Sequence, residues 1–475
     1  MPTVISRVHL ENFRSFRRPT TINLKPLTLL FGQNSAGKSS IIKALLFLQQ
    51  SLDSPSRSQS PGAGFIFSGT AVDLGSFAAT VSQHDTNQPI RVGVTAQTIG
   101  RDGQIDKTVS NIWGLRSADK SRHLDVDLEV VAGDQSLHFT RHPTAAQFVL
   151  SPTSVDAWLT LARGTANLFS DDNGFEEELE SGRGSAPIFK GTHFPERLRL
   201  ELLPPNLLDT WKQQDVAASR AQASDSTEPS LRSNPLLERW DDFASEFWQP
   251  MRHQLRGVIH IGPLRREPQR FERYIPTELN EVGSAGQHTL ALMNERAPLL
   301  RQVNDYLQLL QLPFRIRVKS LGSSQTVGDI ISLMLVNPDT RLEVSPSDVG
   351  VGYSQVLPLI TQCAISRARL VCVEQPELHL HPAMQARLAD VFITESNGGN
   401  RTRFLIETHS ENLMLRVLRR IREGQLSPDD VAVLYVDQDD NGDSIVHEIP
   451  IDGNGDFAAE WPKGFFDERL EELGW

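Results

Sequence analysis

The feature that most constrains this chain is the loop GQNSAGKS at residues 32–39, which matches the phosphate-binding pattern of Gly, four residues, Gly-Lys and Ser or Thr. An apolar strand is predicted just before it, at Leu27–Phe31, and a helix just after it, at Ser40–Gln50. In such a loop the backbone N–H groups turn inward around phosphate oxygens, and the positive end of the helix points at them. The sequence therefore predicts nucleotide binding at this loop.

Two side chains of the loop have separate expected roles. Lys38 is expected to reach the β- and γ-phosphates of the nucleotide, and Ser39 is expected to ligate Mg²⁺. The nucleotide-binding residues predicted in this part of the chain are Gly32, Asn34, Ser35, Ala36, Gly37, Lys38, Ser39 and Ser40.

Composition places the chain among globular proteins. Its 475 residues suffice for two or three domains, and its charged fraction of 22% is ordinary for that class. No apolar run approaches a membrane span, the N-terminus has no signal-peptide pattern, and Cys363 and Cys372 are expected to be reduced core residues. These features predict a cytoplasmic protein. The net charge of -12 argues against a coat of nucleic acid but leaves room for a local basic groove.

A second glycine-rich segment, DVGVGYSQ at residues 348–355, precedes an apolar helix predicted over Val356–Ala364. Glycines ahead of a helix expose its positive N-terminus and suit it to an anion. An ordinary capped helix is the alternative interpretation of the same letters. Its position shortly before the next motif favours the anion site.

The next motif is a predicted buried strand, Leu370–Val373, that ends in the acidic letters EQPE. A hydrophobic strand ending in acid is the Walker B arrangement, in which the first carboxylate, here Glu374, holds Mg²⁺ directly or through water. The following position normally carries the glutamate that activates the attacking water, but this chain has Gln375, which positions water without taking its proton. Glu377 is the nearest substitute, and its reach is left open by the sequence.

A further predicted strand, at residues 404–409, ends in His409. Taken alone, a histidine at a strand end carries little meaning. Here it follows the loop, the glycine-rich segment and the acidic strand end in order along one chain. That order favours a functional role for His409.

Together with the opening letters HLENFRSF at residues 9–16, these motifs resemble the ABC-class ATPase heads of SMC proteins and of the overcoming-lysogenisation-defect (OLD) ATPases. The resemblance implies an α/β fold: an ABC-class P-loop ATPase head with co-folded N- and C-terminal lobes and a mixed α+β insertion. The expected domains are an N-terminal lobe at 1–87, an insertion of unknown role at 88–255, and a C-terminal lobe with a β-rich module at 256–475. No sustained heptads occur, so a long coiled-coil arm is not expected.

The resemblance also implies roles for the later motifs. Residues 348–355 correspond to the signature motif, which contacts the γ-phosphate held by the opposite protomer, and His409 corresponds to the switch histidine. The implied signature residues are Gly350, Gly352, Ser354 and Gln355, with Ser354 donating its hydroxyl. The cofactors would then be ATP and Mg²⁺, enclosed between two chains. The implied assembly is a homodimer or a larger homo-oligomer.

OLD-like ATPases that lack a Toprim nuclease domain are often found in bacterial anti-phage systems, such as the Septu subunit PtuA, beside a separate nuclease. The tail at Trp461–Leu473 resembles the C-terminal module of such a family. Asp437 and Asp439 resemble the acidic pair of Toprim nucleases, but too little chain follows them for that domain. The resemblance therefore implies a partner nuclease, with DNA as a further candidate partner and no membrane.

Residues 437–448 also fit the EF-hand calcium pattern. Both flanks are β-rich, whereas a calcium loop of that kind needs a helix on each side. A hairpin with a turn of Asp, Asn and Gly is therefore the preferred interpretation.

Histidines and arginines outside these motifs have ordinary alternatives. His379 and His381 are two residues apart in a loop, which favours packing or a subunit contact over a metal site. Arg265 is a candidate for a phosphate or interface contact. A run of four arginines can contact nucleic acid or a partner, or form a solvated helix face. The run consists of Arg416, Arg419, Arg420 and Arg422.

Gln375 shapes the functional hypothesis. Without a catalytic glutamate, ATP hydrolysis should be slow, so that an ATP-bound assembly persists and controls a nuclease partner in anti-phage defence. The alternative is an SMC-like DNA-binding clamp in repair, in which ATP closes a ring on DNA. A third hypothesis, that the chain is itself a nuclease, lacks a convincing acid cluster.

Overall fold

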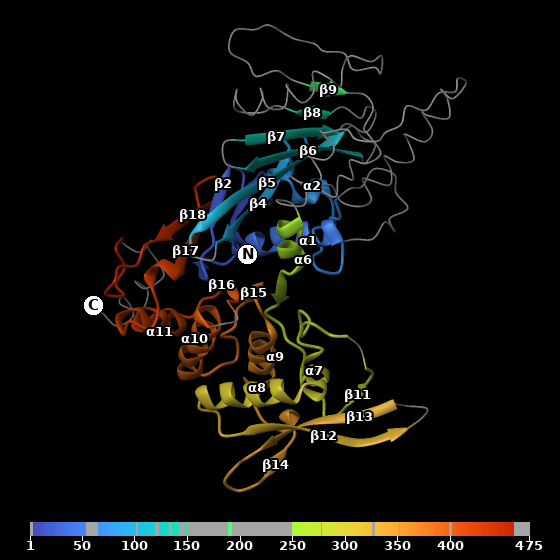
Figure 1. Ribbon diagram of the computed structural model, residues 1–475, viewed down its shortest axis with the longest axis vertical. Coiled ribbons are helices and arrows are strands. Elements are labelled where there is room, and N and C mark those ends of the chain that lie inside the picture. Colours follow the sequence, from blue (N-terminus) through green and yellow to red (C-terminus); the bar gives the residue numbers. More distant parts are fainter. Residues whose placement is uncertain are drawn as a thin grey trace. The chain divides into compact units, whose positions relative to one another are not determined.

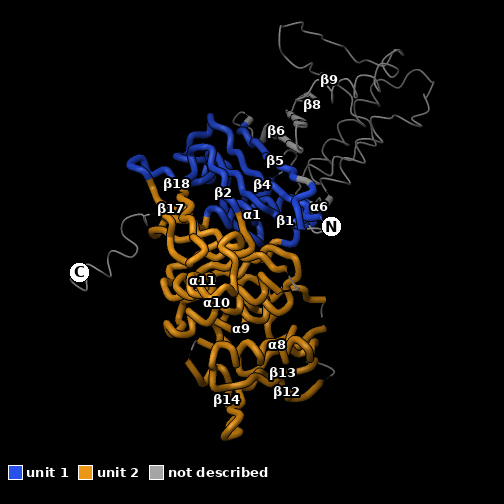
Figure 2. Tube along the Cα trace, turned by 60° about the vertical axis from the view of Figure 1, so that its left-hand side comes forward, with its two compact units in different colours: residues 1–23, 40–257, 439–444 blue, residues 24–39, 258–438, 445–475 orange. Residues whose placement is uncertain are grey.

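The computed structural model forms two compact units, which Figure 2 shows in different colours. The first unit comprises residues 1–23, 40–257 and 439–444, and the second comprises residues 24–39, 258–438 and 445–475. The structure describes residues 3–53, 65–100, 103–118, 123–132, 135–141, 148–150, 189–191, 249–276, 278–324, 328–350, 352–398 and 401–459. Each unit combines segments from distant parts of the chain. The domain boundaries expected from the sequence remain a prediction.

The second unit is built on a six-stranded sheet with the order β10-β15-β16-β3-β17-β18. Its strands are β3 (Leu27–Gly32), β10 (Ile259–Ile261), β15 (Leu370–Glu374), β16 (Arg403–Glu407), β17 (Val431–Gln438) and β18 (Ser444–Ile449). Figure 1 labels four of these strands, β15, β16, β17 and β18. The strands from β10 to β17 are parallel to their neighbours. The carboxyl ends of β3, β15 and β16 therefore meet at one edge of the sheet, the usual place for a ligand.

Helices connect these parallel strands, because a parallel connection needs a crossover. They are α7 (Thr289–Glu295), α8 (Ala297–Leu309), α9 (Gly352–Ile365), α10 (Pro382–Asn397) and α11 (Glu411–Arg422), whereas α1 (Lys38–Asp53), which follows β3, belongs from Ser40 onward to the first unit. All six residues of β3 are buried, as expected for a strand covered on both faces. The sheet and helices share one core that includes Phe31, Val373, Phe404 and Val433. The strands predicted next to the loop, the acid and the histidine are thus confirmed.

Apolar residues at helical spacing predict one helix over residues 285–311, and this prediction is wrong in one respect. Two helices, α7 and α8, occupy the segment, with non-helical backbone at Arg296 between them. Pro298 lies in the first turn of α8, where its missing N–H costs little, whereas in the middle of one long helix it would remove a hydrogen bond and clash. The apolar spacing is correct, but the proline determines where the helix breaks.

A smaller antiparallel sheet with the order β11-β13-β12 completes the second unit, and β14 pairs with β13. Its strands are β11 (Glu272–Tyr274), β12 (Arg315–Ser324), β13 (Gly328–Val336) and β14 (Glu343–Val344). The sequence predicts strands at Phe314–Leu321 and Ile330–Val336, and the structure confirms both with bounds that differ by a few residues.

The first unit contains an antiparallel sheet with the order β2-β1-β4-β5-β6-β7. Its strands are β1 (Thr3–Glu11), β2 (Thr20–Asn23), β4 (Ile90–Ile99), β5 (Ile105–Ala118), β6 (His123–Ala132) and β7 (Gln135–Arg141), with β8 (Phe148–Leu150) and β9 (Phe189–Gly191) as a separate pair. Two short helices, α2 (Phe77–Thr80) and α6 (Gln249–Arg256), join α1 in this unit. Strand β4, from the segment expected as an insertion, pairs with β1.

Aromatic side chains form the centre of the first unit. The ring of Phe47 on α1 lies 6.3 Å from that of Phe13 and 5.5 Å from that of Phe65, which in turn lies 6.5 Å from Trp113 on β5. Tilted and edge-on arrangements of this kind add to the stabilisation from burial. In the part of the chain that the structure describes, none of the helices has the length and apolar character that crossing a membrane requires.

The turn between β17 and β18 is a hairpin turn, as predicted, with strands on both sides. Its Asp439 accepts backbone hydrogen bonds from Asn441 and Asp443, both at 3.0 Å, and an ion pair from Arg18, also at 3.0 Å. The backbone bond from Asp443 is the main reason that the pKa of Asp439 lies below its usual value. Protein donors thus occupy the carboxylate that an EF-hand would give to calcium.

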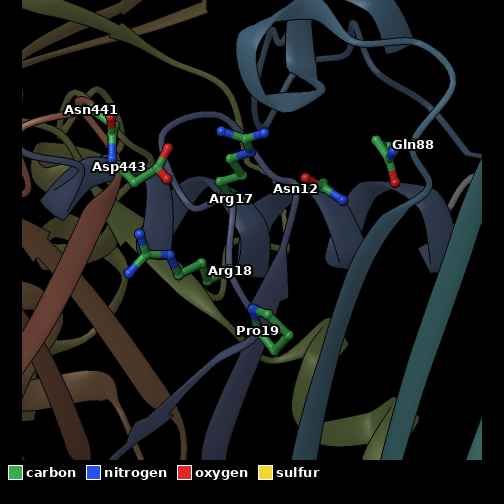
Figure 3. Close-up of a pocket in the computed structure, with 7 residues that line it drawn as sticks. All are labelled: Asn12, Arg17, Arg18, Pro19, Gln88, Asn441 and Asp443. Carbon is green, nitrogen blue, oxygen red and sulfur yellow. The ribbon is translucent and has the colours of Figure 1, made fainter.

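This turn also borders a polar recess of about 350 Å³ in the first unit (Figure 3). Arg17 and Arg18, from the loop between β1 and β2, lie opposite Asn441 and Asp443 of the turn. A backbone hydrogen bond of 2.7 Å from Ser444 to Ser15 ties the two loops together. The opening motif HLENFRSF and the turn therefore hold each other in place.

The arginine run on α11 is largely paired within the chain. Arg416 and Arg420 bind the buried carboxylate of Asp390 on α10, at 2.6 and 2.7 Å, and Arg420 also binds Glu423. Arg419 forms an exposed pair with Glu423 at 2.7 Å. The interpretation of the whole run as a solvated face is thus wrong for Arg416 and Arg420, which join two helices.

We predict that Asp390→Ala lowers the free energy of unfolding by about 3 kcal/mol, because it leaves two partly buried guanidinium groups without their carboxylate. Arg419→Ala, which breaks only an exposed pair, should change stability little and is the matched control. Urea unfolding followed by fluorescence measures both variants. Equal effects of the two substitutions would contradict a structural role for Asp390.

Candidate nucleotide-binding site

The loop at residues 32–39 has a backbone that depends on its glycines. Gly32, Ser35 and Gly37 have φ of 134°, 65° and 111°, in the region that favours glycine. A Cβ atom at Gly32 would lie 2.0 Å from the carbonyl oxygen of Val436 on β17, so no other residue fits there. Helix α1 begins directly after this loop, at Lys38. The geometry is that of an anion cradle at a helix N-terminus.

Lys38 lies inside the curve of this loop. Its side chain is only 3% exposed, and its Nζ donates hydrogen bonds to the carbonyl oxygens of Gly32 and Gln33, at 2.8 and 2.7 Å. Burial lowers its pKa, and the charges of Glu407 and Glu377 act in the opposite direction. The ammonium group is thus held next to the loop on which the phosphates are expected.

Ser39 is bound to a carboxylate that the sequence interpretation missed. Its Oγ donates a hydrogen bond of 2.7 Å to Oε2 of Glu407, the last residue of β16. β16 pairs directly with β3, so its last residue lies beside the start of the loop. The sequence does show an acidic residue, Glu407, at the end of a buried strand. The strand order that brings Glu407 next to Ser39 cannot be predicted from the sequence alone.

The oxygen atoms at this point fit a magnesium ion. A hydroxyl and a carboxylate are ligands that Mg²⁺ prefers, and the ion usually takes only one or two protein ligands beside phosphates and water. Ser39 and Glu407 would hold the ion here, and it would neutralise charge on the phosphates.

Glu374, the predicted magnesium ligand, has a different contact. Its Oε1 lies 2.7 Å from Nε2 of His260 on β10. Strand β16 separates β15 from β3, so the carboxylate in contact with Ser39 is that of Glu407. The role of Glu374 at the metal stays a prediction, and His260 is its immediate partner.

Gln375 has an unusual backbone conformation. Its φ of 45° lies in the left-handed region, which costs a non-glycine residue on the order of 1 kcal/mol and is common at functional sites. Its N–H donates to the carbonyl oxygen of Glu407 at 2.7 Å, and the carbonyl of Glu374 accepts from Arg265 at 3.1 Å. Both ends of the peptide unit between Glu374 and Gln375 are therefore fixed.

Glu377 is engaged at both of its oxygens. Oε2 accepts a hydrogen bond from the Thr408 hydroxyl and Oε1 accepts one from the backbone N–H of His409, both at 2.7 Å. Burial raises its pKa, and these hydrogen bonds counteract part of the rise. The carboxylate therefore braces the turn that follows β16.

His409 is held by that turn. Its Nε2 is buried and finds no hydrogen-bond partner among the residues that the structure describes. Burial, and to a lesser degree the charge of Lys38, lower its pKa, so the ring is neutral at neutral pH. A buried nitrogen without a partner is costly, and a phosphate oxygen would relieve that cost.

The signature segment has an outer and an inner part. Gly350 is exposed, and Gly352 begins α9. Ser354 and Gln355, within the first turn of α9, are buried inside their own chain, at 5% and 6% exposure. The glycines thus form the accessible part of the segment. The hydroxyl contact of Ser354 with an opposite chain remains a prediction.

Two further candidates have contacts within the chain. The side chain of His381 caps α10, since its Nδ1 accepts from the N–H of Ala383 at 3.3 Å. Arg265 is 6% exposed, and its guanidinium donates to Gln355 at 3.4 Å as well as to Glu374. Burial lowers the pKa of Arg265 to about 10, so it stays charged at neutral pH.

We predict that Glu407→Gln weakens the Mg²⁺-dependent part of ATP binding by about tenfold, because it removes the charge of the carboxylate next to Ser39. Titration of a fluorescent ATP analogue with Mg²⁺ and with EDTA measures that part. Glu423→Gln, at the residue directly after α11, is the control. If Glu374→Gln has the whole effect and Glu407→Gln has none, the metal site belongs to Glu374.

Comparisons with known proteins match two long parts of the chain to AAA domains. Residues 164–415, more than half of the chain, match a family described as "AAA domain, putative AbiEii toxin, Type IV TA system". Residues 4–127 match a family described as "AAA ATPase domain", and residues 426–474 match one described as "Protein of unknown function (DUF3696)". A comparison with curated proteins gave no match.

Solved structures with similarity to the chain include heads of SMC proteins. The SMC head domain from Thermotoga maritima has 12% identity and a TM-score of 0.40, over 94% of this chain and 100% of that one. An Smc head domain with an extended coiled coil, bound to the C-terminal domain of ScpA derived from Pyrococcus furiosus, has 13% identity and a TM-score of 0.39, over 99% of both chains.

The fold and the family matches lead to the same conclusion. A phosphate-binding loop lies between a buried strand and a helix, at the carboxyl edge of a parallel sheet, as in P-loop ATPases. An ATPase domain family matches the part of the chain that contains this loop. The chain belongs to the AAA-domain ATPase family whose model spans its residues 164–415.

Proposed function

We propose that this chain is a nucleotide-controlled switch that binds ATP with Mg²⁺, hydrolyses it slowly and controls a separate nuclease in a bacterial anti-phage complex. The observation that carries the proposal is the state of the carboxylates around Gln375. Glu377 is the nearest substitute for a catalytic base, and both of its oxygens accept hydrogen bonds. These bonds hold the carboxylate on Thr408 and on the backbone of His409, so we infer that Glu377 serves this turn and does not replace the missing glutamate.

Slow hydrolysis follows from this chemistry. Gln375 can orient a water molecule through its amide, but it cannot accept the proton that the water loses. A positioned general base contributes roughly 100-fold or more to such a rate. The ATP-bound state is then long-lived, which suits a switch that holds a partner in one state rather than a motor that cycles rapidly.

The proposed assembly is a homodimer, or a larger homo-oligomer, through ATP. Lys38, Ser39 and His409 of one chain would contact the phosphates, and the glycine-rich start of α9 of the other chain would close the site. The exposure of Gly350 supports this arrangement, since a Cβ there would meet no atom within 4 Å and the backbone is accessible. The positive end of α9 suits the γ-phosphate.

The anti-phage setting rests on two supports. The order of motifs resembles OLD-like ATPases without a Toprim domain, which are often paired with a nuclease. The matched family is described as a putative AbiEii toxin of a Type IV TA system, and the proposal takes a role in such a system from that description.

The alternative is an SMC-like ATPase that closes on DNA. Basic side chains that such a clamp could use to contact DNA are Arg265, Arg266, Arg416 and Arg419. Arg265 is buried, and Arg416 is bound to Asp390, so neither is placed to meet a phosphate backbone from solvent. Arg266 and Arg419 are exposed, but each pairs with a glutamate, so the described contacts lend the clamp little support.

We predict that the wild type hydrolyses ATP slowly and that Gln375→Glu raises kcat by about 100-fold, because it supplies the missing base. Steady-state phosphate release measures the turnover of both proteins, and Lys38→Ala is the control for phosphate release that does not come from this site. Brisk turnover by the wild type, with no gain in Gln375→Glu, would exclude the slow switch.

We further predict that the purified chain, alone with ATP and Mg²⁺, shows no salt-dependent duplex binding at physiological salt and no cleavage of DNA. Fluorescence anisotropy of a labelled duplex from 50 to 200 mM salt and a gel assay test these points. Tight binding that falls steeply with salt, and that weakens in Arg266→Ala, would favour the DNA clamp.

A further inference from the structure

A buried arginine connects two parts of the site. Arg265 follows β10 and is 6% exposed. Its Nη2 donates to the carbonyl oxygen of Glu374 at 3.1 Å, and its Nη1 donates to Oε1 of Gln355 on α9 at 3.4 Å. Burial of a guanidinium group is costly unless its contacts compensate. These contacts therefore indicate why an arginine lies inside the second unit.

The first contact fixes the peptide group that precedes Gln375. The carbonyl of this peptide group accepts from Arg265, and its N–H donates to the carbonyl of Glu407. Gln375 lies in the left-handed region, a conformation that persists only where the surroundings impose it. Arg265 and Glu407 supply that constraint from opposite sides. The direction of the Gln375 side chain thus depends on the guanidinium group.

The second contact joins the same guanidinium to the signature helix. Gln355 lies in the first turn of α9, three residues after Gly352, at the end of the helix proposed to face the other chain's γ-phosphate. Gln355 is itself 6% exposed, so this contact is shielded from water. Nε of Arg265 is also buried and has no hydrogen-bond partner among the described residues. One N–H donor of the guanidinium group is therefore unused in this structure.

We propose that Arg265 is a positioning residue that couples the start of α9 to the backbone of Gln375. When the nucleotide of the second chain contacts α9, Gln355 shifts and the guanidinium group of Arg265 moves with it. This movement reorients the peptide group between Glu374 and Gln375, and with it the side-chain amide of Gln375. Hydrolysis then depends on closure of the dimer, and not only on nucleotide in one chain. This inference rests on the proposed function, since it assumes that Gln375 orients the attacking water.

Arginine is needed for this role because of its shape. The planar fork presents two donors in fixed directions, one for each contact, whereas the ammonium group of lysine is a single point. Arg265→Lys keeps the charge and much of the length but loses the simultaneous contacts. Gln355→Leu keeps the arginine and removes its α9 contact, together with the 3.5 Å hydrogen bond from Gln355 to the Ser354 hydroxyl.

The test compares Arg265→Lys, Gln355→Leu and their combination with the wild type. We expect each single variant to lower kcat by about tenfold or more, because small displacements of a positioning group are costly, while the Kd for an ATP analogue changes less than about twofold. The double variant should be no slower than the slower single variant, since both interrupt one connection. Arg266→Lys, a neighbouring exposed arginine, is the control and should match the wild type.

Each outcome decides the matter. Weaker ATP binding or a lower Tm without a separate fall in kcat would show a merely structural arginine, and additive effects in the double variant would exclude coupling. If Arg265→Lys fails to fold, Gln355→Leu alone still decides, because an unchanged kcat overturns the proposal. The same variants in a Gln375→Glu background separate this inference from the slow switch. If Arg265→Lys and Gln355→Leu lower kcat both with Gln375 and with Gln375→Glu, the positioning role is supported, even if Gln375→Glu alone does not raise kcat.

Discussion

The site depends on the position of β16 between β3 and β15. Because these strands are parallel and in register, their carboxyl ends present the phosphate loop, Glu407 and the Glu374–Gln375 peptide group side by side. A different strand order would leave every motif intact in the sequence and would separate them in space. The register between β15 and β16, which places Glu374 opposite Glu407, is therefore as important to the chemistry as the motifs themselves.

Charges gathered at this edge stabilise one another. Lys38, Glu377 and Arg265 are all partly or fully buried, and burial alone would disfavour the charged form of each. The carboxylates counteract that effect on Lys38 and Arg265, and hydrogen bonds from Thr408 and His409 counteract it on Glu377. A charge in such a group cannot be removed without leaving another one uncompensated. The effects of substitutions at this edge should therefore not be additive.

The sequence predicted what local patterns encode. The phosphate loop, the acidic strand end, the strand before His409 and the hairpin turn follow from letters that are adjacent in the chain, and the structure has each of these elements in place. Glu407 and His260 were missed because their roles depend on which strands lie next to each other. The inward direction of Ser354 and the pairing of Arg416 with Asp390 likewise depend on packing, which no short pattern contains.

Glu407 makes two contacts with different parts of the site. Its side chain holds Ser39, and its backbone carbonyl holds the N–H of Gln375. A cation bound by Ser39 and Glu407 would therefore act on Glu407, whose backbone carbonyl accepts the hydrogen bond from the N–H of Gln375. Free ATP and the ATP–cation complex would then differ in how they position Gln375, and not only in how tightly they bind. The chain would then respond to the complete metal–nucleotide complex, so that the cellular concentration of the cation would also control the state of the switch.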